Sequence, residues 1–195
     1  MEALVALAAF SIVSAVTPGP NNILLWASGA TFGFRATIRH MLGSAVGIGG
    51  MALVLAAGLG ALFTLVPELE VGMKVAASAY LLVLAYQIAG AHALRRGQLG
   101  RPLGIRQAAA FQVINPKAWI FALGAITTFR PPGLPPVTGS LLVVLVMVLI
   151  IVPAAALWAG AGEALGRLLT EDRRGRVVGV ALALIVAATV VYVWI

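Results

Sequence analysis

The stretch "SAVTPGPNNILLW", residues 14–26, interrupts the first apolar run of the chain. Pro18 and Pro20 have no backbone N–H groups, so they cannot donate to the carbonyl groups four residues earlier. Gly19 between them permits an unwound turn, and two adjacent asparagines follow. We therefore predict that one helix ends before Pro18 and that a second helix begins at Pro20, with Gly19 as its cap.

The composition places this break inside a membrane. Of the 195 residues, 62% are hydrophobic and only 10% are charged, and the mean hydropathy is +1.06. A soluble domain carries roughly 25% charged residues, and one small core cannot bury so much apolar surface. We expect an integral membrane protein surrounded by the lipid bilayer. The chain has no cysteine, so disulfide and thiol chemistry are excluded.

Six apolar runs follow one another along the chain. They cover about 3–27, 41–66, 75–94, 108–129, 139–162 and 177–195. Each run is long enough to cross about 30 Å of hydrocarbon as a helix. None alternates between apolar and polar residues as a membrane β-strand does. The predicted fold class is an all-α membrane protein with six transmembrane helices, forming a single transmembrane domain over residues 1–195.

The arginines are distributed unequally between the two sides of the membrane. The loops after the first, third and fifth runs hold ten of them: Arg35, Arg39, Arg95, Arg96, Arg101, Arg106, Arg167, Arg173, Arg174 and Arg176. The opposite side has only Lys74 and Arg130. Because basic loops stay in the cytoplasm, we predict that these three loops are cytoplasmic and that both termini lie outside. The net charge of +7 therefore reflects membrane orientation, and no nucleic acid partner is expected.

Lys117 is the basic residue that fits in no loop. It lies about nine residues into the fourth run, within "QVINPKAWIFAL". An ionisable group at that depth costs several kcal/mol unless it is paired or hydrated, so we interpret Lys117 as functional. The alternative is that the span begins later and Lys117 snorkels to the inner surface.

His40 and His92 lie near inner ends of spans and are expected at the protein surface. The sequence does not decide whether Gln112 faces a pathway.

The first break has a counterpart half a chain away. Setting "VTPGPNNILLW" beside "VINPKAWIFAL" with Pro18 and Pro116 in register places Thr17 on Asn115. The first three spans then correspond to the last three, and a repeat of three spans must insert its second copy upside down. We predict a 3+3 inverted repeat with broken helices 1 and 4, whose breaks meet near the middle of the membrane. In secondary transporters such paired breaks mark the substrate site. Repeat A covers about 1–94 and repeat B about 108–195.

The second break predicts the same chemistry as the first. In "NPKA", Asn115 is expected to cap a helix that begins at Pro116. Two half-helix N-termini would point into the bundle, with free N–H groups and partial positive charge. With Lys117 they suit a carboxylate, while asparagine amides and freed carbonyls suit the ammonium group of an amino acid. The alternative for each break is an ordinary proline kink. The candidate substrate-binding residues are Thr17, Pro18, Gly19, Pro20, Asn21, Asn22, Asn115, Pro116 and Lys117.

Other chemistries lack the residues they need. The sequence has no HExxH and no Ser/His/Asp set, and the six runs contain no aspartate. Their only glutamate, Glu163, sits at the inner end of the fifth run. We therefore expect no enzyme activity, no metal site and no cofactor. A dibasic substrate would also need a buried acid, so we expect neutral amino acids. The same absence leaves the chain without an evident proton relay.

The early "TPGPN" (17–21) and the mid-chain "NPKAW" (115–119) resemble the two signatures of the lysine exporter (LysE/RhtB) family of amino acid efflux proteins. The length, the six runs and the basic loop before the second motif are similar too, so the resemblance covers essentially the whole chain. It implies a transporter that exports amino acids or close derivatives across the bacterial inner (plasma) membrane. It also implies an ion gradient as the driving force, and we expect protons. Carried over, it points to Pro18, Gly19, Pro20, Asn21, Asn115, Pro116 and Lys117.

The hypothesis is an exporter that works by alternating access about the paired breaks. Two other functions stay open. The same scaffold can export another small metabolite or an ion, and substrate competition would separate these. A membrane scaffold that transports nothing is the second alternative, and its breaks would tolerate substitution. The sequence does not decide the oligomeric state, for which a homo-oligomer is one alternative.

Overall fold

The computed structural model describes residues 2–58 and 101–167, together with scattered residues between 68 and 86 and between 180 and 191. The two continuous stretches hold the helices α1 (Glu2–Val16), α2 (Pro20–Phe32), α3 (Phe34–Ala56), α6 (Ile105–Val113), α7 (Pro116–Thr128) and α8 (Pro136–Gly166). No strand occurs among the described residues. The predicted all-α class is confirmed for this part of the chain.

Four of the six predicted spans have counterparts among these helices. α3 and α8 are each long and apolar enough to cross a membrane, and α1–α2 and α6–α7 qualify as two bent pairs. The described residues therefore hold two membrane-crossing helices, or up to four if each bent pair is one span. The predicted spans 75–94 and 177–195 lie largely outside the described residues. Six spans and the 3+3 repeat therefore stay predictions.

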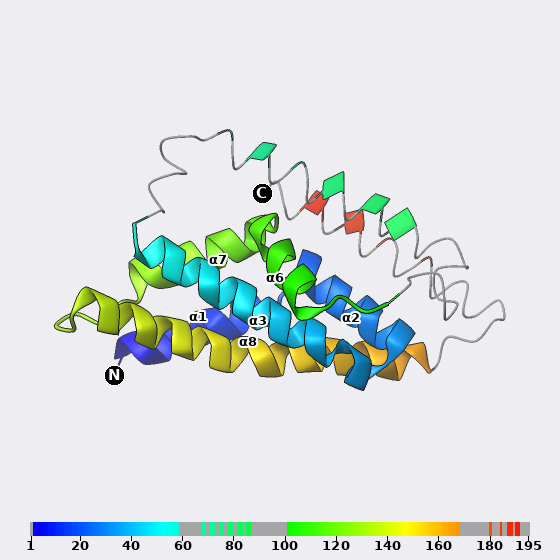
Figure 1. Cartoon of the computed structure of the whole chain (residues 1–195), viewed down its shortest axis with the longest axis horizontal. Coiled ribbons are helices and arrows are strands. Elements are labelled where there is room, and N and C mark those ends of the chain that lie inside the picture. The colour runs from blue at the N-terminus through cyan, green and yellow to red at the C-terminus, as the bar shows by residue number, and fades with distance from the viewer. Residues whose placement is uncertain are drawn as a thin grey trace.

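The broken pairs run in opposite directions along the molecule (Figure 1). α1 and α2 lead from the left end to the right end of the view, and α6 and α7 lead back. The N-terminus and residues 129–135 lie at the left end. The turn between α2 and α3, residues 101–104 and the end of α8 lie at the right end. The segments that carry Arg35, Arg101 and Arg167 thus gather at one end, as the charge pattern requires.

The first loop is far shorter than the apolar runs predict. Runs that end at 27 and resume at 41 leave a loop over 28–40, but α2 continues to Phe32 and α3 begins at Phe34. Only Gly33 separates them, with a φ of 84° that favours glycine. The expected boundaries are wrong here because hydropathy marks the lipid-buried part of a helix. The hydrogen-bonded backbone continues beyond it through polar residues.

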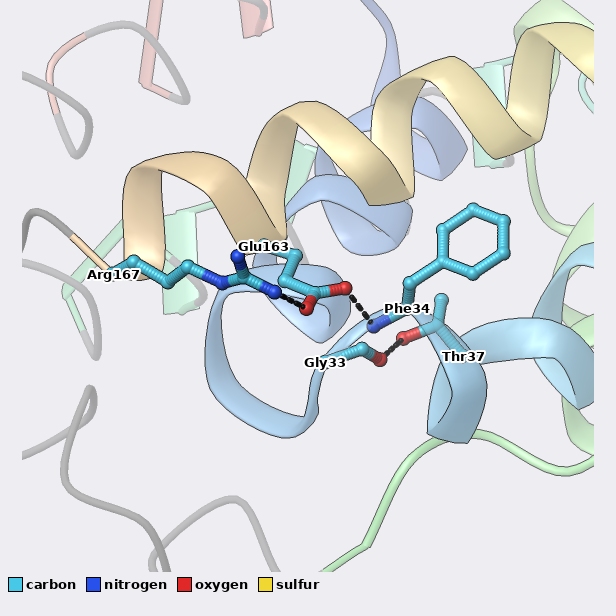
Figure 2. Close-up of polar contacts among 5 residues, drawn as sticks. All are labelled: Gly33, Phe34, Thr37, Glu163 and Arg167. Carbon is cyan, nitrogen blue, oxygen red and sulfur yellow. Dashed lines mark hydrogen bonds and ion pairs between the residues drawn. The ribbon is translucent and has the colours of Figure 1, made fainter.

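A carboxylate from α8 fixes this turn (Figure 2). Glu163 Oε2 accepts a hydrogen bond of 2.8 Å from the backbone N–H of Phe34, the first residue of α3. Its Oε1 pairs with Arg167 Nη2 at 2.5 Å, and Thr37 Oγ1 donates to Gly33 O at 2.9 Å. A negative charge is favourable at a helix N-terminus, where backbone N–H groups lack partners. Glu163 therefore caps α3 and ties α8 to the α2–α3 turn.

α2 and α8 pack with their backbones in contact. A Cβ atom at Gly29 would lie 2.0 Å from Ala159 O, and one at Gly162 would lie 2.0 Å from Trp26 O. Small residues permit this close approach of membrane helices, where interhelical packing replaces the hydrophobic effect. The contact holds α2 against α8 and so fixes the position of the helix start at Pro20.

The core lies between α1, α3, α7 and α8. Leu7, Ala52, Ala122, Val143 and Met147 have no exposed surface. Other faces of the helices expose large apolar side chains, which suits contact with lipid. Each of the following is more than 60% exposed: Val5, Ile120, Val137, Leu149 and Leu157.

Candidate functional site

Both helix breaks occur at the predicted residues. α2 begins at Pro20 with Gly19 as its N-cap, and α7 begins at Pro116 with Asn115 as its N-cap. The chain bends by 56° between α1 and α2 and by 77° between α6 and α7. A proline at the first position of a helix loses no hydrogen bond, because that N–H has no helical acceptor. The predicted helix starts are confirmed.

Lys117 joins the two breaks. Its Nζ donates to Thr17 O at 2.6 Å, to Thr17 Oγ1 at 2.7 Å and to Pro18 O at 3.2 Å. Gly19 allows the side chain to pass, since a Cβ atom there would lie 2.7 Å from Lys117 Cδ. The prediction that the breaks meet is confirmed. The ammonium group uses its three donors on the first break, which is a different arrangement from snorkelling to the surface.

This arrangement differs from the role that the sequence suggested for Lys117. The hypothesis places Lys117 beside a substrate carboxylate and leaves the freed carbonyls for a substrate ammonium. In the structure the lysine ammonium itself lies on the oxygens of Thr17 and Pro18. The first break is therefore a cation site, and a group of the protein fills it.

Thr17 and Asn22 donate hydrogen bonds to carbonyl groups that the break leaves without helical donors at the end of α1. Thr17 Oγ1 donates to Ser14 O at 3.1 Å. Asn22 Nδ2 donates to Ala15 O and to Thr17 O, each at 2.8 Å. These carbonyls precede the break and have lost the helical donors that would otherwise follow. Asn22 therefore holds the carbonyl of Thr17 in the orientation that Lys117 uses.

Hydrogen bonds between buried side chains form a second connection between the two breaks. Asn21 Oδ1 accepts from Gln112 Nε2 at 2.8 Å and from Ser44 Oγ at 2.8 Å. Gln112 Oε1 in turn accepts from Asn115 Nδ2 at 3.1 Å. All four side chains are buried.

Gln112 and Ser44 were not among the predicted site residues. The only sequence signal for Gln112 is its spacing of three from Asn115, and the sequence gives no signal for Ser44.

The two breaks border a cavity of about 460 Å³, the open space at its mouth included. Five predicted residues line it, and Thr17, Pro18, Pro20 and Pro116 shape the breaks around it. Among the described residues that line the cavity, Lys117 is the only ionisable one. The lining residues are Ser14, Ala15, Gly19, Asn21, Asn22, Ile48, Asn115, Lys117, Ala118, Phe121, Ile151, Ala154 and Ala155.

Asn115 presents an unused acceptor at this cavity. The residue is 3% exposed, and its Oδ1 has no hydrogen-bond partner in the described part of the chain. Buried polar atoms nearly always have a partner, so an orphaned oxygen in a cavity wall points to a ligand that donates hydrogen bonds. An ammonium or hydroxyl group has the required chemistry.

The expectation for His40 is wrong. His40 has no exposed surface, because α3 begins six residues before it and packs on two neighbours at this level. Thr37 Oγ1 and Ser28 Oγ lie 2.9 Å apart between α3 and α2, and Gly43 faces α6. A residue expected at the end of a loop thus lies where three helices meet. His92 lies outside the described residues.

Comparisons with known proteins agree with this architecture. The chain is 28% identical over 184 residues to the "Cysteine/O-acetylserine efflux protein" of Escherichia coli O139:H28 (strain E24377A / ETEC), covering 94% of each chain. Proteins of the same name from Escherichia coli (strain K12) and Shigella sonnei (strain Ss046) are 28% identical over 177 residues, which is 90% of this chain and 89% of theirs. No solved structure gives a significant match. The family model "LysE type translocator" matches residues 12–194, a range that includes both breaks. The chain therefore belongs to the LysE family of membrane translocators.

Proposed function

We propose that this protein is a secondary-active exporter of small neutral amino acids or their close derivatives. The observation that carries the proposal is the junction of the two breaks. There, three oxygens hold an ammonium group and the buried Asn115 Oδ1 lacks a donor in the described part of the chain. Relatives named as efflux proteins for cysteine and O-acetylserine support the direction of transport and the substrate class.

The lining of the cavity favours an uncharged substrate side chain. The described lining residues include no carboxylate, so a second positive charge, as on lysine or arginine, would be buried there without a partner. Ile48, Phe121 and Ile151 offer apolar surface instead. A small neutral side chain therefore fits the lining better than a basic one.

In the binding mode that we propose, each end of an amino acid meets a different part of the breaks. The ammonium group binds Asn115 Oδ1 and the oxygens of Thr17 and Pro18. The carboxylate binds the N-termini of α2 and α7, where the first N–H groups have no helical acceptor and the helix dipole is positive. Asn21 can add its Nδ2, because its Oδ1 already accepts two hydrogen bonds.

The transport cycle extends this binding mode. The cavity opens alternately to the two sides as the broken helices of an inverted repeat rearrange about it. The protein lies in the bacterial inner membrane with its arginine-bearing end in the cytoplasm and both termini outside. An inward proton gradient drives export.

Efflux from bacterial cells tests the proposal. Cells expressing the protein are loaded with mixed amino acids by feeding dipeptides, and the external pool is followed by mass spectrometry. We expect faster loss of a few small neutral amino acids. Asn115→Leu should slow this loss about tenfold or more, because a hydrogen bond to a charged group is lost. Thr127→Ala is the matched control, since Thr127 lies on the same helix, is exposed, and bonds only Leu123 O.

Other outcomes separate the alternatives. Loss of lysine or arginine would contradict the inference from the missing acid. Loss of a different metabolite, with amino acids retained, would indicate another cargo for the same scaffold. No change in any solute, with the protein shown in the membrane, would support a scaffold that does not transport.

A further inference from the structure

We propose that the Lys117 ammonium and the substrate ammonium compete for one set of oxygens, Thr17 O, Thr17 Oγ1 and Pro18 O, and that this competition couples export to proton entry. The inference rests on the export function proposed above. It assigns to the first break a subsite for primary ammonium groups, and to Lys117 the role of proton carrier.

The subsite is built to accept hydrogen bonds. Thr17 Oγ1 gives its only hydrogen to Ser14 O, at 3.1 Å, so toward Lys117 it acts as an acceptor. Thr17 O has two lone pairs, and Asn22 Nδ2 occupies one of them at 2.8 Å. Asn22 can keep this carbonyl in place when Lys117 leaves. The three acceptors match the three donors of any primary ammonium group, in a lysine side chain or in an amino acid.

Two ammonium groups cannot use the subsite together. Lys117 already engages all three oxygens, and like charges in contact repel more strongly in a partly buried site than in water. No ionisable residue of α1, α2, α3 or α8 lines the cavity. These helices therefore supply no negative charge that would offset a second positive charge. His40 lies on α3, but it is fully buried and does not line the cavity. Glu163 is engaged with Phe34 and Arg167 at the α2–α3 turn.

This competition would exchange one proton for one amino acid in each cycle. Lys117 Nζ releases a proton to the cytoplasm and becomes a neutral amine, which gives up the oxygens to the substrate ammonium. After the cavity has reoriented, Nζ takes a proton from outside, and the lysine ammonium returns to the oxygens and displaces the substrate. One proton enters for each zwitterionic amino acid that leaves, and one positive charge enters per cycle. Lysine can carry this proton because, unlike arginine, it can deprotonate inside a protein.

Two substitutions of Lys117 give opposite expectations in proteoliposomes, with labelled O-acetylserine and labelled cysteine as probes. An interior that is more acidic by about one pH unit, with the membrane potential clamped, should drive about tenfold accumulation by the unmodified protein. In Lys117→Met the oxygens stay free, so counterflow should continue while the accumulation driven by the pH difference disappears. In Lys117→Arg a permanent cation stays near the oxygens, so counterflow should be lost.

A third variant keeps the lysine and changes only the subsite. Thr17→Val removes one of the three acceptors with little change of shape. The remaining two should hold the charged lysine less tightly, so deprotonation becomes easier. We expect the midpoint of the pH profile of counterflow to move to lower pH by about one unit. An unchanged midpoint would overturn the proposal even if both Lys117 variants failed to fold.

The controls distinguish this mechanism from its rivals. His40→Leu removes the fully buried titratable side chain of the described residues and should retain the accumulation driven by the pH difference. Loss of accumulation in His40→Leu together with its retention in Lys117→Met would assign the proton to His40. Counterflow that survives in Lys117→Arg and fails in well-folded Lys117→Met would show that Lys117 binds the substrate carboxylate. Absence of exchange in the unmodified protein would reject the export function itself, and this mechanism with it.

Discussion

Asn21 and Asn22 are adjacent and of the same type, yet the structure gives them different tasks. Asn22 stabilises the backbone, because its Nδ2 donates hydrogen bonds to the carbonyls of Ala15 and Thr17. Asn21 is buried and joins the amides that lead through Gln112 to the second break. The sequence predicted that both amides meet the substrate. It could not separate them, because an amide beside a helix break can satisfy either the backbone or a ligand.

Gly19 leaves room for the Lys117 side chain where the two breaks meet. Its φ of −177° is extended and open to any residue, so contact with Lys117 explains the glycine better than backbone conformation does. A Cβ atom would lie 2.7 Å from Lys117 Cδ and 3.2 Å from its Nζ. In Gly19→Ala we expect the flexible end of Lys117 to be displaced from its oxygens. Accumulation driven by a pH difference should fall about tenfold, while the protein stays folded.

The matched control for this substitution is Gly50→Ala. A Cβ atom at Gly50 meets nothing within 4 Å, and the residue lies inside α3. Transport should be unchanged, and helix stability should rise by roughly 0.5–1 kcal/mol because alanine restricts the unfolded chain. Proteoliposome accumulation and thermal unfolding in detergent measure both effects. Equal transport by Gly19→Ala and Gly50→Ala would show that the position of Lys117 does not matter.

The helix starts were predictable and the helix contacts were not, for a physical reason. A proline at the first helical position follows from local backbone rules, so Pro20 and Pro116 could be located from the sequence. The bond between Asn21 and Gln112 joins residues 91 positions apart, and the one between Phe34 and Glu163 joins residues 129 apart. Such contacts depend on how the helices pack, which a single sequence does not state.

The cap on α3 carries a prediction about stability. Glu163→Ala removes the acceptor for Phe34 N, so the midpoint of thermal unfolding should fall by roughly 2–4 °C. Glu163→Gln should lower it less, because an amide oxygen can still accept this hydrogen bond although the charge is lost. Arg167→Ala should have the smallest effect, since an exposed i,i+4 ion pair contributes little. If Arg167→Ala matched Glu163→Ala, the ion pair and not the cap would stabilise the turn.

The molecule as a whole combines two opposed broken helices with one arginine-bearing end (Figure 1). α1–α2 and α6–α7 run in opposite directions, and their breaks touch through Lys117 and Thr17. The charge pattern and the pairing of the breaks are separate properties of the sequence, and both require that these helices enter from opposite sides. The arrangement of the described helices agrees with this requirement, and the inverted repeat itself stays a prediction because its third and sixth spans lie largely outside the described residues.

The orientation of this bundle in the membrane can be tested directly, because the chain has no cysteine of its own. Single cysteines are introduced as Glu2→Cys and Leu134→Cys at one end, and as Arg101→Cys at the other; all three residues are exposed. Arginine-rich ends stay in the cytoplasm, so a membrane-impermeant maleimide should label the first two in intact cells. Arg101→Cys should react only after the membrane is permeabilised. The reverse pattern would place the arginines outside and reject the predicted topology, and the proton would then have to leave Lys117 at the opposite end of the molecule.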